Sequence, residues 1–304
     1  MSAKTLAITG ATGFVGQTLV RLAVEGGWHV RALTRSPQPP RDGVTWISGA
    51  LDQPASLDAL TRSSDAIIHV AGVVNAPDRA GFALGNVDGT SAAIAAASRA
   101  GVSRFIHVSS LAAREPGLSD YGWSKAEAEA VVVASDRNWT MVRPPAIYGP
   151  GDKDMLDLFK MARLGFVLVP PVGRTSIIEV GDLARLMLLL VETPDAQRKI
   201  YEPDDGRPCG WSYAEFGRAI GRAVGRNVIT VSTPRVILNL GAKLDRLARG
   251  AAAKLTADRA AYLCHADWVV SDANRVPSRI WTSQVDAISG LHATATAYRA
   301  RGWL

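Results

Sequence analysis

Through the first half of the chain, short apolar runs alternate with longer segments in which apolar residues recur at helical spacing. Five runs have the length and apolar content of buried strands: 5–9, 28–33, 44–48, 66–70 and 104–108. Helical patterns follow Phe14 and occupy 56–62 and 87–100. This alternation predicts an α/β fold with a doubly wound parallel sheet, right-handed crossovers and helices on both faces.

A glycine-rich turn separates the first predicted strand from the first predicted helix. Gly10, Gly13 and Gly16 have the spacing G-x-x-G-x-x-G, one residue longer than the standard dinucleotide fingerprint. Glycines lack the Cβ atoms that would hold a pyrophosphate away from the backbone, and the helix N-terminus behind them offers free N–H groups. An ordinary glycine-rich turn is the alternative, but the strand–turn–helix context favours nucleotide binding to a Rossmann-like sheet.

The end of the second predicted strand indicates which dinucleotide fits. An acidic residue there would hydrogen-bond the ribose 2′-hydroxyl of NAD, but Thr34 stands in that position, 18 residues after Gly16, and Arg35 follows it. A guanidinium matches a 2′-phosphate with fork geometry, whereas a carboxylate would repel it. We therefore predict NADP as the cofactor; NAD, with Arg35 as a solvated surface residue, is the alternative.

A tyrosine–lysine pair supplies the candidate chemistry. Tyr121 and Lys125 are four residues apart on a predicted helix, so both point to one face. A phenol with a pKa near 10 is a poor acid at neutral pH, and a neighbouring ammonium stabilises its phenolate. Ser109 and Ser110 end the preceding strand. A serine hydroxyl at that strand end can hydrogen-bond the substrate oxygen with which Tyr121 would exchange a proton. The order of glycine turn, serines and tyrosine–lysine pair gives the motif its weight.

Composition and charge narrow the function classes. The chain has 304 residues, a net charge of +6 and a pI of about 9.5, with basic residues scattered rather than clustered, which argues against nucleic-acid binding. The longest apolar run, 186–191, is too short to span a bilayer, and no signal peptide fits the N-terminus, so we expect a cytoplasmic protein.

Two cysteines make neither a disulfide framework nor a metal cluster, and no metal site is expected. His69 and His107 lie inside apolar strands and are interpreted as core residues.

Beyond about Gly149 the strict alternation ends. Helices are predicted at 155–163, 182–192 and 212–224, the last with Ser212 as N-cap and Glu215 three residues later. The segment 234–255 is amphipathic, with Ile237, Leu240, Leu244 and Leu247 against Lys243, Arg246 and Arg249. It fits a lid, a dimer face or a membrane-surface helix, but packing on its own protein is the favoured interpretation.

Together these motifs resemble the short-chain dehydrogenase/reductases, and more closely their extended branch, the NAD-dependent epimerase/dehydratase family. The matching segments are TGATGFVG at 9–16, HVAG at 69–72, NVDGT at 86–90, FIHVSS at 105–110, YGWSK at 121–125 and VRPPAIYGPGD at 142–152. Looser matches at 178–182 and 290–304 extend the resemblance over essentially the whole chain.

The resemblance implies roles for individual residues. Tyr121 would be the general acid/base, Lys125 would bind the nicotinamide ribose and tune Tyr121, Ser110 (or its neighbour Ser109) would orient the substrate oxygen, and Asn86 would support this geometry. The implied cofactor-binding residues are Gly10, Thr12, Gly13, Phe14, Val15, Gly16, Arg35, Leu51, Ala71, Gly72, Tyr121, Lys125, Pro144 and Ile147. Residues 1–150 would form the NAD(P)-binding domain, with 174–195 packing back on it, and 151–304 mainly a small α+β substrate domain. Related proteins often dimerise through the long helices, here near 87–100 and 121–135.

Three departures from the family pattern bear on the substrate. Gly49-Ala50-Leu51 replaces a Gly-Asp-Leu stretch whose aspartate reads adenine in many members. Ser110 and Tyr121 are only 11 residues apart, and a stretch that helps form the sugar pocket of epimerases is missing. Ser110-Leu111-Ala112 has no acid, which argues against dehydratase chemistry.

We therefore predict an NADP-dependent oxidoreductase that acts on a carbonyl or alcohol of a modest, fairly apolar small molecule. An epimerase-type isomerase with a tightly held cofactor is the first alternative. A non-catalytic NADP-binding scaffold or redox sensor is the second, although a pure binder has no need of Tyr121.

Overall fold

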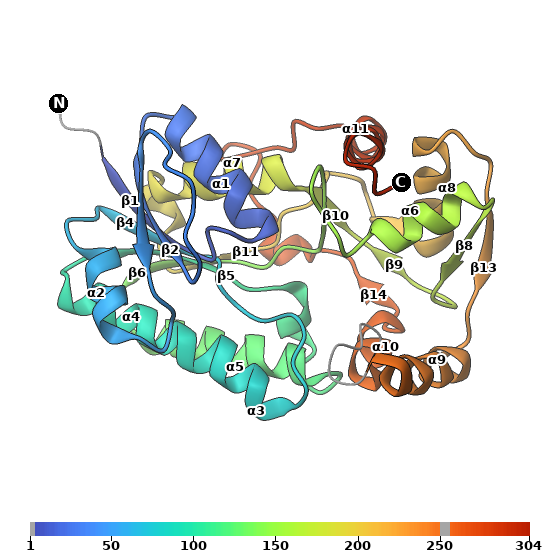
Figure 1. Ribbon diagram of the computed structural model, residues 1–304, viewed down its shortest axis with the longest axis horizontal. Coiled ribbons are helices and arrows are strands. Elements are labelled where there is room, and N and C mark those ends of the chain that lie inside the picture. Colours follow the sequence, from blue (N-terminus) through green and yellow to red (C-terminus); the bar gives the residue numbers. More distant parts are fainter. Residues whose placement is uncertain (1–3, 250–255) are drawn as a thin grey trace. The chain divides into compact units, whose positions relative to one another are not determined.

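The computed structural model describes residues 4–249 and 256–304 (Figure 1). The chain forms two compact units. Unit 1 contains Met1–Arg143 and Leu183–Tyr201, and unit 2 contains Pro144–Asp182 and Glu202–Leu304. Among the described residues, no helix has the length and apolar character needed to cross a bilayer.

Unit 1 is built on a seven-stranded sheet with the order β11-β6-β5-β4-β1-β2-β3. All neighbouring strands are parallel, as predicted. The order reverses between β1 and β4, and in such sheets ligands bind at the carboxyl ends of the strands beside this switch point. The strands are β1 (Thr5–Thr9), β2 (His29–Thr34), β3 (Val44–Ser48), β4 (Ala66–His69), β5 (Arg104–Val108), β6 (Asn138–Val142) and β11 (Lys199–Tyr201).

Helices cover both faces of this sheet (Figure 1). On one face lie α1 (Phe14–Glu25) and α7 (Val180–Val191), and on the other α2 (Pro54–Thr61), α4 (Gly89–Arg99) and α5 (Asp120–Ala134). Apolar residues of alternate strand positions, such as Ala7, Ile67 and Phe105, pack against residues of the second group of helices. Each large aliphatic side chain buried there contributes about 1.5–3 kcal/mol.

The predicted helix at 87–100 differs in its first turns. A short helix, α3 (Arg79–Phe82), continues into a π-helical segment, Ala83–Asp88, before α4 begins. Such wide turns are rare in proteins overall, and those that occur often lie at functional sites. Asn86 lies in this segment with 1% of its surface exposed.

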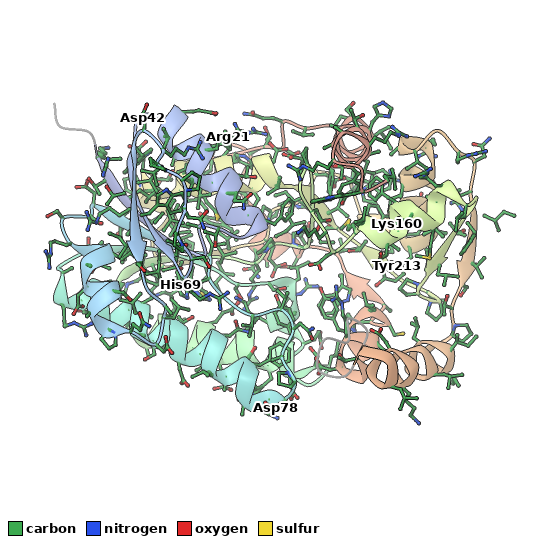
Figure 2. The ribbon with its side chains drawn as sticks, viewed as in Figure 1. Arg21, Asp42, His69, Asp78, Lys160 and Tyr213 are labelled. Carbon is green, nitrogen blue, oxygen red and sulfur yellow. The ribbon has the colours of Figure 1, made fainter. Side chains whose placement is uncertain are left out.

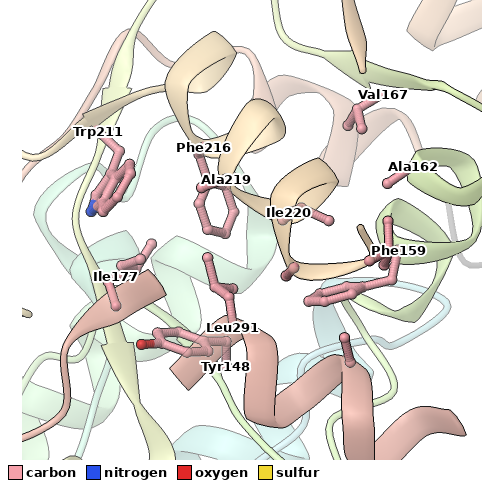
Figure 3. Packing of buried hydrophobic residues seen from close by; sticks show 14 of the residues in the cluster. Tyr148, Phe159, Ala162, Val167, Ile177, Trp211, Phe216, Ala219, Ile220 and Leu291 are labelled. Atoms are coloured by element: carbon pink, nitrogen blue, oxygen red, sulfur yellow. The ribbon is translucent and has the colours of Figure 1, made fainter. Parts of the chain in front are cut away.

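Unit 2 has a core of its own, in which aromatic and aliphatic side chains of α6, α8 and α11 meet (Figure 3). Phe159 of α6 contacts Tyr298 of α11 edge to face, and Ile220 of α8 is fully buried in the same cluster. The predicted capping box of α8 is confirmed, since Ser212 accepts from Glu215 N while Glu215 accepts from Ser212 N. The helices are α6 (Leu156–Arg163), α8 (Tyr213–Ala223), α9 (Arg235–Arg249), α10 (Ala257–Leu263) and α11 (Ala287–Ala300).

Within the described residues, the strands of unit 2 form three small sheets. In the first, β7 (Ala146–Tyr148) pairs with β10 (Ile177–Glu179), and in the second, β9 (Arg174–Thr175) lies between β12 (Trp211–Ser212) and β14 (Asp267–Trp268). The third is a parallel ribbon of β8 (Phe166–Val169) and β13 (Ile229–Ser232). The amphipathic segment predicted at 234–255 forms α9 up to Arg249, and its remainder, 250–255, lies outside the described residues.

Candidate active site

The glycine turn after β1 has no room for side chains at Gly10 and Gly16. Gly13 N donates to Gly10 O at 3.0 Å, and a Cβ atom on Gly16 would lie 2.0 Å from that same oxygen. Gly10 has a φ of +71°, and a Cβ there would lie 2.7 Å from Ala71 N at the end of β4. The turn and the carboxyl end of β4 therefore lie against each other at the switch point of the sheet.

The N-terminus of α1 is open to an anion. Gly13 is its N-cap without a side-chain hydrogen bond, and the first turn contains no acidic residue. The helix dipole and the free N–H groups of this turn favour a phosphate. The residues of the turn therefore fit the pyrophosphate of a dinucleotide.

At the carboxyl end of β2, Arg35 is an exposed cation beside a tight polar turn. Thr34 Oγ1 donates to Ser36 O at 2.6 Å, which fixes the turn, and Arg35 has no ion-pair partner among the described residues. Leu51 lies after β3, and its side chain contacts Gly89 at the start of α4. The end of β2 thus offers a free guanidinium.

Asn86 joins the loop after β4 to helix α5. Its Oδ1 accepts from Val73 N at 2.8 Å, and its Nδ2 donates to Val73 O at 3.0 Å and to Ser124 Oγ at 2.9 Å. Ser124 Oγ donates in turn to Tyr121 O at 2.8 Å. A Cβ on Gly72 would lie 2.8 Å from Asn86 Oδ1 and 3.9 Å from Lys125 Nζ, so this loop passes directly over the lysine.

Tyr121 lies in the first turn of α5. Ser119 caps this helix by accepting from Gly122 N at 2.9 Å, and the half-buried Tyr121 ring lies 6.1 Å from the ring of Phe82. The cap fixes where the helix begins, and with it the position of Tyr121.

Lys125 is buried one helical turn further along α5, and its Nζ donates to Val108 O at 2.8 Å. Burial lowers its pKa to about 8, although Glu129 acts in the opposite direction. An ammonium held in low dielectric acts on a nearby phenolate more strongly than one in water. Its bond to the last residue of β5 fixes Lys125 at the carboxyl edge of the sheet.

The two serines after β5 have different partners. Ser109 Oγ donates to Glu129, which also forms a two-pronged ion pair with Arg143, with 2.8 Å between Nε and Oε1. Ser110 Oγ accepts from Ala112 N at 3.2 Å and donates to no described group. The Ser110 hydroxyl proton therefore has no acceptor among the described residues, whereas Ser109 belongs to the hydrogen-bond network of Glu129 and Arg143.

The two strand histidines are core residues, as the sequence predicted. His69, labelled in Figure 2, and His107 are almost fully buried, and the centroids of their stacked rings are 5.6 Å apart. His69 hydrogen-bonds Thr9 and Thr90, and burial lowers its pKa to about 3. Burial also lowers the pKa of His107 well below its usual range, so both rings are neutral at physiological pH.

Unit 1 therefore brings together the glycine turn, Gly72, Asn86, Ser110 and the Tyr121–Lys125 pair at the carboxyl edge of its sheet. Pro144 and Ile147 belong to unit 2, where Pro144 is buried and Ile147 lies on β7. Sequence reasoning missed Ser124, although it lies inside the YGWSK motif. It also missed the Glu129–Arg143 pair, because partners 14 residues apart, one on a helix and one just after a strand, have no signature in the sequence.

A family model described as NAD(P)H-binding matches residues 10–162. The chain is 39% identical to the ceramide reductase of Caulobacter vibrioides over 311 residues, which covers 98% of this chain and 96% of that protein. It is 26% identical to the UDP-glucose 4-epimerase of Vibrio cholerae over 273 residues, which covers 79% of this chain and 82% of that protein. The solved structure of MoeE5 in complex with UDP-glucuronic acid and NAD is similar with a TM-score of 0.75 at 19% identity, covering 98% of this chain and 100% of that one.

Proposed function

Because the chain belongs to the extended short-chain dehydrogenase/reductases, an NAD(P)H-binding family of reductases and epimerases, we propose that it uses NADPH to reduce a ketone group of a ceramide-like lipid to an alcohol. The observation that carries this proposal is the similarity to ceramide reductase, which extends over 98% of the chain at 39% identity. The epimerase similarity is weaker and shorter. The short connection between Ser110 and Tyr121, which begins with the 3₁₀ turn Leu111–Arg114, favours the same choice.

Tyr121, Ser110 and Lys125 form the proposed catalytic set. NADPH, when bound, supplies the hydride from C4 of its nicotinamide. The Tyr121 hydroxyl donates its proton to the substrate oxygen, the Ser110 hydroxyl hydrogen-bonds that same oxygen, and the Lys125 ammonium stabilises the phenolate left behind. Asn86 acts through Ser124 and the backbone of Tyr121, so it is a positioning residue.

Unit 1 is the proposed cofactor domain, and unit 2 is the proposed substrate domain. The proposed cofactor-binding residues are those implied by the family resemblance, including Pro144 and Ile147 of unit 2. The helices α4 and α5 are the proposed homodimer face. These assignments rest on the family resemblance.

For cofactor choice, we expect Arg35→Ala to narrow the preference for NADPH over NADH. A charge-assisted bond between a guanidinium and a 2′-phosphate contributes about 1.5–3 kcal/mol, so the ratio of the two dissociation constants should fall roughly ten- to hundredfold. Titration of both cofactors against the parent and the variant measures this ratio. Arg62→Ala, which removes another exposed arginine of unit 1, should leave the ratio unchanged. Equal dissociation constants in the parent protein would contradict an NADP preference.

For pH dependence, we expect kcat/KM for NADPH-dependent reduction to fall above a pH of about 8. The pKa of Lys125 is lowered to about 8 by burial, and above that pH the ammonium that stabilises the Tyr121 phenolate loses its proton. Lys125→Arg keeps the positive charge at all accessible pH values, so its profile should lose this alkaline limb. If kcat/KM of Lys125→Arg still falls at the same alkaline pH, the fall is caused by the titration of another group.

The proposal is tested by cofactor stoichiometry. The protein is incubated with NADPH and a panel of ketones, aldehydes and an oxidised ceramide, in which a hydroxyl group has been converted to a ketone. The amounts of alcohol product and of NADP formed are both measured. One NADPH consumed per alcohol formed, with the ceramide-like ketone preferred, supports the proposal. Turnover of a nucleotide sugar without net cofactor change would favour the epimerase, and no turnover of any compound would favour the binding scaffold.

A further inference from the structure

Exposed apolar side chains are concentrated on one part of unit 2. Six of the fourteen large hydrophobic residues that are exposed in the described chain lie between residues 229 and 247, in β13 and α9. Val236 and Leu247 of α9 are 78% and 88% exposed, and Ile229 of β13 is 73% exposed. Burying such side chains is worth about 1.5–3 kcal/mol each, so leaving them in water needs an explanation.

On α9 these residues form one stripe. Val236, Leu240, Lys243 and Leu247 recur at intervals of four, three and four residues, and all four are exposed. At 3.6 residues per turn they fall on a narrow arc of the helix. Asp245 lies on the opposite side and is half-buried, and α9 packs against α10 within unit 2. The favoured prediction is that this helix packs on its own protein. It applies only to the side of α9 opposite to this stripe.

The ribbon of β8 and β13 exposes a second apolar face. Val167 is buried and packs with Val169 and Thr230 near Gly217 of α8, whereas the alternate residues Leu168, Ile229 and Val231 face outward and are exposed. An outward strand face is ordinarily polar. Only Thr233 and Pro234 separate β13 from α9, so the two apolar surfaces belong to consecutive elements of the chain. We call them the apolar strip, made of Leu168, Ile229, Val231, Val236, Leu240 and Leu247.

Basic groups flank the apolar strip. Next to the ribbon, a hollow of about 600 Å³ is lined by Lys160, Arg163, Arg226 and Arg299, and no ion pair reaches these four cations within the described residues (Lys160 is labelled in Figure 2). Leu164, which also lines the hollow, directly precedes Gly165, whose oxygen accepts from Ile229 N at 3.0 Å. The sequence of α9 contains four basic residues and one acidic residue. Apolar side chains beside the unpaired cations of the hollow match a surface of acyl chains beneath anionic headgroups.

We propose that the apolar strip and the basic hollow beside it dock unit 2 on a bilayer that carries anionic lipids. A second copy of this chain fits less well, because pairing α9 with itself would bring together two helices with a net charge of +3 each. Docking would let a lipid substrate enter from the bilayer, and this purpose, though not the binding itself, rests on the proposed reductase function.

Sedimentation of the full chain with vesicles tests the docking. Vesicles of phosphatidylcholine alone are compared with vesicles in which roughly a third of the lipid is phosphatidylglycerol. We expect binding to the anionic vesicles, weaker binding to the neutral ones and release at high salt. The double variant Leu240→Glu/Leu247→Glu should lower the partition coefficient at least roughly tenfold, because it puts two charges into the interface. Lys160→Glu/Arg163→Glu should reduce the preference for anionic vesicles.

The matched control is Leu189→Glu, the same exchange at an exposed leucine of α7 in unit 1, which should bind vesicles like the parent. An NADPH-induced melting shift in each variant verifies its fold. Failure of the parent to bind anionic vesicles, or equal binding by the Leu240/Leu247 double variant, would overturn the proposal. So would conversion of a dimer into a monomer by that variant without vesicles, which would make the apolar strip a subunit interface. Vesicle binding without any reductase activity would refute only the proposed function, and NADPH oxidation without vesicle binding would refute only the docking.

Discussion

Tyr121→Phe is expected to lower kcat for NADPH-dependent carbonyl reduction by roughly 10²–10⁴-fold, the contribution of a positioned general acid. The substitution removes a single oxygen atom. It leaves the Ser119 cap, the Ser124 bond to the Tyr121 backbone and the Lys125 bond to Val108 in place. Because these contacts hold the loop and the helix, the affinity for NADPH should fall far less than kcat.

Steady-state rates and cofactor titrations on the parent and on Tyr121→Phe make this comparison. Tyr148→Phe is the matched control, since the buried Tyr148 hydroxyl in unit 2 has no hydrogen-bond partner among the described residues. It should retain activity. A Tyr121→Phe enzyme with parental kcat would remove Tyr121 from the chemistry, and an equal loss of NADPH affinity would make it a binding residue instead.

Gly16→Ala should weaken NADPH binding by roughly a hundredfold or more and lower the melting temperature. Its Cβ would lie 2.0 Å from Gly10 O and 2.8 Å from Ala11 Cα, and both contacts are with backbone that cannot rotate away. Either α1 moves away from β1 or the turn opens, and in both cases the N–H groups proposed to receive the pyrophosphate are displaced. Overpacking of this kind costs about 1–3 kcal/mol or more in stability alone.

Calorimetric titration and thermal melting measure the two effects of Gly16→Ala. Gly117→Ala provides the control, because a Cβ at Gly117 has no neighbour within 4 Å and its φ is ordinary. That variant should match the parent in both measurements. NADPH affinity of Gly16→Ala within twofold of the parent would mean that the cofactor does not bind at this turn.

Hydrophobic pattern predicted five of the seven strands in the sheet of unit 1, among them the central strands β1, β4 and β5, which are buried almost throughout. It did not predict β6 or β11. The bounds of β1, β3 and β5 agree with the sequence to the residue. Local chemistry was equally reliable at α8, where Ser212 and Glu215 cap the helix through groups only three residues apart. Signals that act over a few residues can be seen in a sequence.

The polar interior of the site could not be predicted in the same way. The sequence shows Tyr121 and Lys125 on one helix face, but the depth at which Lys125 is buried, and therefore its lowered pKa, depends on the loop at Gly72 and on β5. The π-helical segment around Asn86 leaves no distinct hydrophobic period, because Asn86, a polar residue, is its one buried residue and Leu84 is exposed. The choice of Ser110 over Ser109 depends on Glu129, which the fold brings to Ser109.

The stripe on α9 shows a further limit. Amphipathic periodicity indicates that one face of a helix will be covered, but it does not identify the covering surface. The structure leaves Val236, Leu240 and Leu247 exposed, and that exposure led to the proposal of a lipid surface.

Reduction of a ceramide-like ketone with NADPH is tested most directly by isotope transfer. NADPH labelled with deuterium at the transferable position of C4 is incubated with the oxidised ceramide, and the product is examined by mass spectrometry. The predicted result is one deuterium on the new carbinol carbon for each NADPH oxidised. An unlabelled product, or an isomer of the substrate formed without net oxidation of NADPH, would contradict it.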